Sequence, residues 1–175
     1  MDSGKPILGY WKIRGLVAGM RYQLKYCGVD YDCVEYQQGP APDFSRQTWF
    51  DVKPTLGLPF PNLPYLIHGD FKLTESLAIH VYLAEVYDQS LLGKTAADRA
   101  RVSMFAGVIS GLKMKVTMPC YTTGEKADII TAYKAGMPAI LEHKGKNAFL
   151  VGDYPTYIDF YFFEMCEMID AVTEG

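Results

Sequence analysis

Two short stretches in the first half of the chain carry side chains that could hold the charged groups of a small ligand. Tyr10 ends a short apolar segment just ahead of a helical pattern, where its phenol can donate a hydrogen bond to an anion. Glu75 and Ser76 stand at another helix start, where free backbone N–H groups and the serine hydroxyl suit a carboxylate. Glu75 can also accept an ammonium group, so this pair is expected to bind the amino-acid end of a ligand.

Two further segments suit the remainder of such a ligand. Trp49 and Lys53 are four residues apart, so on one helix face they could bind a second carboxylate, although a solvated loop face is an equal alternative. Pro64 follows Asn62 and Leu63 at the start of an apolar run. A cis Leu63–Pro64 bond there would turn the Leu63 N–H and C=O towards a peptide-like ligand. An amino-acid end, a peptide middle, a thiol beside the phenol and a second carboxylate together describe glutathione.

Apolar periodicity predicts that a mixed α/β module positions these residues. Strands are expected at residues 6–11 and 31–36, with a helix over 16–27 between them, and a hairpin at 64–67 and 71–73. A further helix starts at 74–76 and carries apolar residues to 86. The intervening Gly- and Pro-rich segment is predicted to be an ordered functional loop with one short helix near 43–50.

The apolar period changes after residue 88 to that of helices alone. One helix is marked by apolar positions from 102 to 116, and a second by positions 130–140 with a kink at Pro138. Thr156, with Asp159 three residues later, is expected to cap a third helix. The predicted organisation is an α/β domain at 1–88, a linker at 89–95 and an all-helical domain at 96–175.

Composition narrows the possible functions. The chain has 175 residues, of which 49% are hydrophobic and 21% charged, with a formal charge of -3, so a globular fold is expected and a broad basic face for nucleic acid is not. It contains no long apolar run and no signal-like N-terminus, which predicts a cytoplasmic protein without a membrane span. Four cysteines without a C-x-x-C pair and three scattered histidines predict no metal site.

Several segments closely resemble the mu class of glutathione S-transferases. They are ILGYWKIRGL, GPAPDFSRQTW, LGLPFPNLPYLI and LTESLAIHVYLA, while VGDYPTYIDF resembles the capping motif of that family's second domain. The resemblance runs in register from residue 7 to about 168. It implies a thioredoxin-like α/β N-terminal domain plus an all-α C-terminal domain, with glutathione as co-substrate, no metal, and small hydrophobic electrophiles as second substrates.

The resemblance also assigns roles to individual residues. Tyr10 matches the catalytic tyrosine that activates the glutathione thiol, although a half-buried core tyrosine is the structural alternative. Tyr121 matches a tyrosine of the electrophile pocket, although beside Pro119 it could simply end a helix. The positions that match glutathione contacts are Tyr10, Trp11, Leu16, Trp49, Lys53, Asn62, Leu63, Pro64, Glu75 and Ser76.

Three departures from the mu pattern bear on function. Glu75 replaces the usual glutamine and still suits an ammonium partner. Gly111 stands where the family has an acidic residue that reaches across its dimer interface to the glutathione amine. The sequence ends at residue 175, whereas the family continues with helices that cover the electrophile pocket, so the C-terminal helices are expected to be incomplete and the helical domain truncated.

Two other functions remain open from the sequence. One is a weakly active or inactive glutathione transferase-like subunit that serves as a structural or docking module in a larger assembly, which Gly111 and the short helical domain favour. The other is a glutathione-dependent isomerase like the sigma class, although GPAPDFSRQTW matches the longer mu loop instead. The expected partner is a second copy, paired through Phe60 and the helix over 102–116, or a protein that covers the helical domain.

Overall fold

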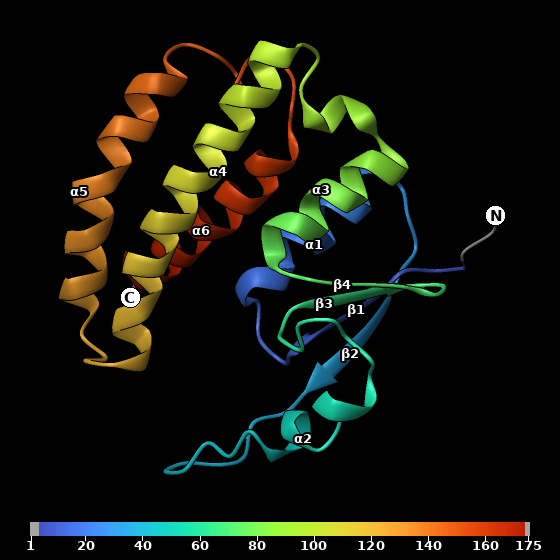
Figure 1. Ribbon diagram of the computed structural model, residues 1–175. Helices are drawn as coiled ribbons and strands as arrows, with labels where there is room; N and C mark the ends of the chain where they lie inside the picture. Colours follow the sequence, from blue (N-terminus) through green and yellow to red (C-terminus); the bar gives the residue numbers. More distant parts are fainter. Residues whose placement is uncertain (1–3, 174–175) are drawn as a thin grey trace. The chain divides into compact units, whose positions relative to one another are not determined.

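The computed structural model describes residues 4–173, which fall into two compact units that divide between Asp88 and Gln89. The first unit has the predicted order β-α-β-α-β-β-α (Figure 1). Its elements are β1 (Ile7–Trp11), α1 (Gly15–Tyr26), β2 (Asp32–Tyr36), α2 (Gln47–Phe50), the 3-10 turn η1 (Lys53–Thr55), β3 (Tyr65–His68), β4 (Phe71–Thr74) and α3 (Ser76–Tyr87).

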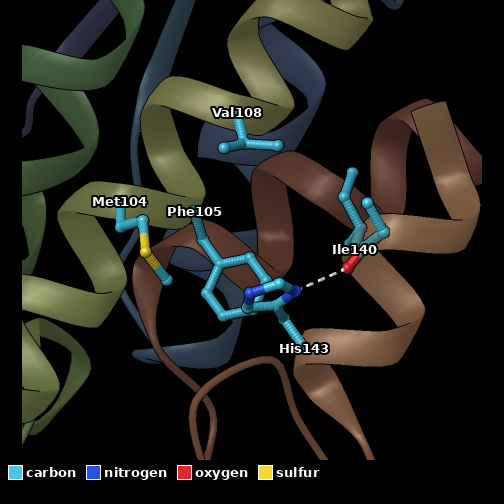
Figure 2. Close-up of a pocket in the computed structure, with 6 residues that line it drawn as sticks. Met104, Phe105, Val108, Ile140 and His143 are labelled. Carbon is cyan, nitrogen blue, oxygen red and sulfur yellow. Dashed lines mark hydrogen bonds between the residues drawn. The ribbon is translucent and has the colours of Figure 1, made fainter.

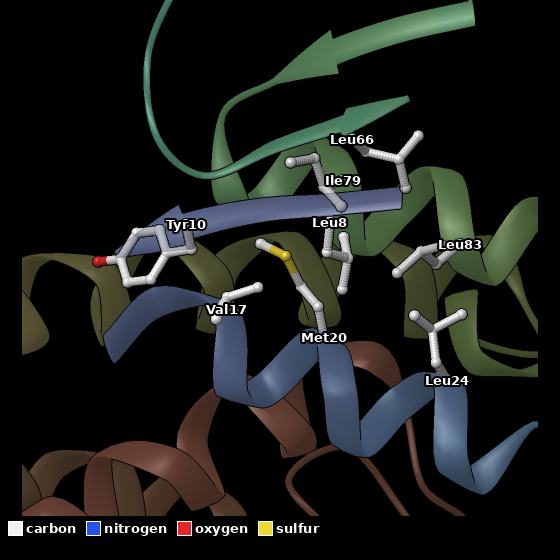
Figure 3. Packing of buried hydrophobic residues seen from close by; sticks show 8 residues of the cluster. All are labelled: Leu8, Tyr10, Val17, Met20, Leu24, Leu66, Ile79 and Leu83. Carbon is white, nitrogen blue, oxygen red and sulfur yellow. The ribbon is translucent and has the colours of Figure 1, made fainter. Parts of the chain in front are cut away.

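The strands form one mixed sheet in the order β2-β1-β3-β4. β1 runs parallel to β2 and antiparallel to β3, and the β3–β4 hairpin completes the sheet. Because side chains alternate along a strand, Leu8 and Tyr10 of β1 and Leu66 of β3 lie on the same face. They pack there with α1 and α3 (Figure 3) in a core that also contains Val17, Met20, Leu24, Ile79 and Leu83.

The opposite face carries a second, aromatic cluster, formed by Tyr36, Trp49 and Tyr65 together with Leu58. The Tyr65 ring crosses β1 at Gly9, where an added Cβ would lie 2.0 Å from the ring, so only glycine fits. The Tyr36 and Tyr65 hydroxyls are 2.9 Å apart, and Trp49 stacks on Tyr65 with ring centroids at 6.1 Å. Burial, followed by this hydrogen bond, raises the pKa of Tyr65 well above its ordinary value. The cluster attaches α2 to the sheet.

The helix expected near residues 43–50 is shorter than predicted, because α2 covers only Gln47–Phe50. Phe44 has φ 43°, a left-handed conformation that a right-handed helix cannot contain. Pro40 and Pro42 precede it and have no N–H to donate. The segment turns instead, with the Phe44 N–H donating to the Pro40 carbonyl at 3.0 Å.

The second unit is helical throughout its regular structure, as its apolar period predicts. Its elements are η2 (Gln89–Leu92), α4 (Ala96–Thr117), η3 (Met118–Tyr121), α5 (Lys126–Lys144) and α6 (Tyr157–Thr173). The expected linker at 89–95 contains η2, whose leucines are buried. α5 runs through Pro138, and the kink at that residue stays a prediction. Among residues 4–173, no helix is long and apolar enough to cross a membrane.

Two threonines pair with an aspartate three residues later at helix starts of this unit. Thr95 and Asp98 form a capping box at the start of α4, and their hydrogen bonds lower the pKa of the Asp98 carboxyl. At the start of α6, the Thr156 N–H and hydroxyl donate to one Asp159 oxygen at 2.8 and 2.7 Å. The other Asp159 oxygen accepts from the Leu150 N–H at 2.8 Å. The predicted pairing of Thr156 with Asp159 at the start of α6 is therefore present, with Asp159 as the acceptor, and Asp159 also binds the loop that leads into α6.

A buried ion pair joins α4 to α6. The Lys113 ammonium donates to the Glu164 carboxylate, and each side chain is only 4% exposed. The ammonium also lies 4.2 Å from the centroid of the Tyr161 ring. Burial lowers the pKa of Lys113, and the nearby Glu164 charge opposes that shift. Since each charge has the other as a partner, removal of one alone leaves the remaining group poorly solvated.

We therefore expect Glu164→Gln to destabilise the protein by about 3 to 5 kcal/mol, because it leaves the Lys113 ammonium without a charged partner. The double variant Lys113→Met with Glu164→Leu removes both charges and should recover most of that loss. Urea unfolding followed by circular dichroism measures both effects. An equal loss in the single and double variants would show that packing, not charge pairing, dominates at this position.

Candidate functional site

One end of the sheet brings together three of the predicted site positions. β1 and β3 pair with Gly9 opposite Tyr65, so continuing this antiparallel register by one residue sets Tyr10 opposite Pro64. β3 and β4 pair with Tyr65 opposite Thr74, and the same continuation sets Pro64 opposite Glu75. By this continuation Tyr10 of β1 lies in one row with Pro64 and Glu75, which directly adjoin the paired ends of β3 and β4.

Two helices start at this end of the sheet. α1 begins at Gly15, shortly after β1 ends at Trp11, and α3 begins at Ser76, directly after β4 and Glu75. The first N–H groups of a helix have no partner within the helix, and the helix dipole adds partial positive charge there. Both helix starts therefore suit the negatively charged groups of a ligand.

Tyr10 is 7% exposed and its ring belongs to the main core of the first unit. Figure 3 shows the hydroxyl oxygen at the outer end of the ring, away from the other core side chains. An added Cβ at Gly15, which has φ +42°, would lie 2.8 Å from that oxygen and 2.7 Å from a ring carbon. The ring is thus part of the core, while its hydroxyl lies against the first residue of α1.

Gly15 is a residue that the sequence analysis missed. The Arg14-Gly15 step between strand and helix was the available signal, since glycine tolerates a positive φ that other residues avoid. The sequence pattern could not show that the absence of a side chain at Gly15 makes room for Tyr10, because that contact depends on the direction of the Tyr10 ring.

Glu75 and Leu63 have unusual backbone geometry. Glu75 is exposed and has φ 72° and ψ 115°, a region that non-glycine residues rarely adopt. Such a residue costs on the order of 1 to 3 kcal/mol, and such strain is typical of binding sites. The Leu63–Pro64 bond is cis, as predicted from the sequence. Leu63 is half-buried and packs against both clusters, whereas Asn62 is exposed.

Trp49 and Lys53 lie on different short elements. Trp49, in α2, is 4% exposed inside the aromatic cluster, so it does not lie on a solvated loop face. Lys53 is half-buried and begins η1, whereas Trp49 belongs to α2. Because the two residues stand on different elements, they do not share the single helix face that was expected. Trp11 and Leu16 are also half-buried and pack against the main core.

Tyr121 and Gly111 belong to the second unit. Tyr121 is 73% exposed at the end of η3, which follows α4 directly, so the alternative role of ending a helical segment agrees with its position. Gly111 is exposed on α4, and an added Cβ there would meet no atom within 4 Å. In residues 4–173 no group of three or more His, Cys, Asp or Glu could hold a metal ion.

The second unit also contains an apolar pocket between α4 and α5 (Figure 2). It encloses about 100 Å³ and is lined by Met104, Phe105, Val108, Ala139, Ile140 and His143. Met104 and Val108 are about half exposed, at 49% and 51%. Nδ1 of His143 is 3.0 Å from the Ala139 carbonyl, which holds the ring along α5 at the rim of the pocket.

Comparison with known proteins identifies a family with this fold. The family model of the glutathione S-transferase N-terminal domain matches residues 6–85. Glutathione S-transferase Mu 1 of Mus musculus is 38% identical over 164 residues, which are 92% of this chain and 74% of that protein. A glutathione S-transferase of Dermatophagoides pteronyssinus is 37% identical over 174 residues, covering 97% of this chain and 78% of the relative.

A solved structure is also similar over nearly the whole chain. The crystal structure of the glutathione S-transferase Blo t 8 gives a TM-score of 0.77 at 28% identity and covers 96% of this chain and 81% of its own. The predicted class, a thioredoxin-like domain followed by helices, is confirmed. The chain therefore belongs to the glutathione S-transferase family as a glutathione transferase, and its resemblance to the mu class is confirmed by relatives of that name.

The contact between Gly15 and Tyr10 leads to a prediction. Gly15→Ala should keep the fold but displace the Tyr10 ring, because the new Cβ would lie within 3 Å of it. Gly28→Ala is the matched control, since Gly28 also has a positive φ, +68°, but no atom lies within 4 Å of an added Cβ. Both variants should lose about 1 kcal/mol of stability from the strained backbone.

Only Gly15→Ala should also lose glutathione transferase activity, which steady-state conjugation of an aromatic halide measures. Equal activities in the two variants would show that the position of the Tyr10 hydroxyl does not matter for turnover.

Proposed function

We propose that the protein transfers the thiolate of glutathione to small hydrophobic electrophiles and that Tyr10 activates the thiol. The observation that carries this proposal is the Tyr10 hydroxyl against Gly15 at the start of α1, on the row that continues to Pro64 and Glu75. A tyrosine that served only the core would need neither the start of α1 beside its hydroxyl nor the strained residue Glu75 on the same row.

Thiol activation follows from the charge that each form of the sulfur carries. A free thiol has a pKa of about 8.5 and is mostly protonated at neutral pH. A hydrogen bond donated by the Tyr10 hydroxyl stabilises the thiolate and not the thiol, so it lowers the pKa of the bound thiol. The thiol proton passes to water, the thiolate sulfur then forms a bond to the electrophilic carbon, and the leaving group departs with the electron pair of the bond that breaks.

The remaining predicted residues have complementary roles in binding glutathione. The N–H groups at the start of α3, with the Ser76 hydroxyl, hold the carboxylate of the γ-glutamyl end, and Glu75 takes its ammonium. The Leu63 N–H and C=O pair with the peptide middle. Lys53 binds the glycyl carboxylate, and Trp49 supports that segment from within the aromatic cluster.

Other groups complete this part of the proposal. Trp11, Leu16, Asn62 and Pro64 shape the walls of the glutathione site, a role that their place at this end of the sheet supports. Tyr121 is proposed to contact the electrophile, where its hydroxyl could stabilise developing charge. Its high exposure leaves the phenol accessible to such a ligand.

Tyr10→Phe tests the activation step. The variant keeps the ring in the core and removes only the hydroxyl, so it should still bind immobilised glutathione. Its kcat for conjugation of an aromatic halide should fall by roughly a hundredfold, as for other lost donors to a developing anion. The midpoint of the pH–rate profile should rise by about one to two units, because the thiol loses the donor that favours its charged form.

Tyr31→Phe is the control, since Tyr31 is half-buried beside the same core but lies away from the row of site residues. Wild-type protein that is retained on glutathione yet conjugates no faster than the uncatalysed background would favour the docking module instead. Wild-type protein that is not retained would refute the proposed function.

A homodimer is part of the proposal. Phe60 is the most exposed large hydrophobic residue of those described, at 77%, and stands between two prolines. The pocket between α4 and α5 presents apolar side chains of matching chemistry. In a two-fold pair each Phe60 would enter the pocket of the other copy, so the contact would form twice.

Phe60→Ala should therefore dissociate the dimer. Burial of one phenylalanine side chain contributes roughly 1.5 to 3 kcal/mol, and two such contacts should raise the dimer Kd by at least about a hundredfold. Ala139→Phe, which fills the pocket from the other side, should have the same effect. Phe163→Ala on α6 is the exposed aromatic control. Sizing with light scattering measures the mass, and a monomeric wild-type protein would exclude this pairing.

A further inference from the structure

The segment from the start of η1 to the start of β3, here called the loop, carries proposed glutathione-binding residues near both of its ends. Lys53 begins η1, and Leu63 ends the loop just ahead of β3. Between them, Leu58 is buried in the aromatic cluster and Leu56 packs against it. Those apolar contacts hold the side chains of the loop, but they leave the backbone carbonyl groups of an irregular segment to be satisfied elsewhere.

One of these carbonyl groups is bound by a lysine of the sheet. The Lys72 ammonium donates to the Leu56 carbonyl at 2.7 Å, a contact between residues 16 positions apart. The same nitrogen lies 3.2 Å from the position of a Cβ added to Gly57, whose φ is +63°. Lys72 therefore lies directly against the backbone of two successive loop residues.

The register of the hairpin explains why Lys72 reaches the loop. Lys72 lies opposite Ile67 on the neighbouring strand, so the two side chains lie on the same face of the sheet. Ile67 packs against the aromatic cluster, which places Lys72 on the face that α2, η1 and the loop cover. Leu73, the next residue, packs on the opposite face with the main core.

We propose that Lys72 is a positioning residue for glutathione, which fixes the backbone between Lys53 and Leu63 by binding the Leu56 carbonyl. This inference rests on the proposed function, because it assumes that Lys53 and Leu63 contact glutathione. A hydrogen bond from a charged donor is stronger than a neutral one and holds a loop carbonyl in one place. Without it, the two ends of the loop lose their fixed separation and glutathione must order the loop when it binds.

The expected result is a change in binding without a change in chemistry. Lys72→Met keeps the aliphatic stem and removes the charged donor. Its KM for glutathione should rise by about tenfold, which is the usual effect of one lost charge-assisted hydrogen bond. Its kcat at saturating glutathione should stay within about twofold of wild type, because the loop contacts glutathione equally in ground and transition states.

Three comparisons separate this role from a purely structural one. Lys72→Arg retains a charged donor and should bring KM back to within about threefold of the wild-type value. The midpoint of the pH–rate profile should not move in either variant, since Tyr10 is untouched. Lys25→Met, an exposed lysine in the last turn of α1, removes the same charge elsewhere in the unit and should leave KM unchanged.

The measurements are steady-state kinetics with glutathione varied, on protein first passed over immobilised glutathione. If wild-type protein is not retained, the proposed function fails and this inference fails with it. If wild type is retained and Lys72→Met has the wild-type KM, the positioning role alone is refuted. The same holds if kcat of Lys72→Met falls while its KM rises. Should Lys72→Met not fold, Lys72→Gln supplies the neutral variant, and a KM rise reversed by Lys72→Arg is again the supporting result.

Discussion

The register of β1 between its two neighbours is the constraint on which the proposed site depends. In this register Tyr10 faces α1 and α3 together with Leu8, while Gly9 leaves space for the Tyr65 ring on the other face. A slip of one residue would turn Tyr10 towards the aromatic cluster and bring a side chain against Tyr65. The same pairing sets the row that continues to Pro64 and Glu75.

The two faces of the sheet hold different halves of the proposed glutathione site. The main core fixes Tyr10 and the starts of α1 and α3, which belong to regular elements whose interior backbone groups pair within the strands and helices. The aromatic cluster fixes α2 and the loop after it, where little regular hydrogen bonding exists. This difference is why Lys72 matters in the proposal. Its ammonium binds a backbone carbonyl of the loop, whereas the backbone of β1 is bound by the hydrogen bonds of the neighbouring strands.

The sequence predicted the elements whose signals are local. The first strand, predicted at 6–11, the hairpin and the Thr156–Asp159 pairing were predicted because apolar alternation, turn residues and the Thr-to-Asp spacing each act within a few residues. The helix near 43–50 was predicted too long because the pattern does not show that Phe44 adopts a positive φ. The remaining strands and long helices were predicted from apolar periodicity, whereas the short 3-10 turns η1, η2 and η3 were not.

Contacts between distant residues could not be predicted in the same way. The bond between Lys72 and Leu56 joins two elements whose faces are known only once the hairpin register is fixed. The Lys113–Glu164 pair spans 51 residues and depends on how α4 packs on α6. The closeness of Gly15 and Tyr10 needs a side-chain direction. In each case an ordinary polar or small residue gives no local signal of its partner.

Backbone strain points to a ligand-binding site at the start of α3 more directly than the fold does. A module that only presented a surface would need the core and the sheet, and a relaxed residue before α3 would make it more stable. Glu75 instead has a φ of 72°, at the helix start where a ligand carboxylate and ammonium are proposed to bind. Because that geometry costs stability and the Glu75 side chain is exposed, its presence favours a role in ligand binding over a role in assembly alone.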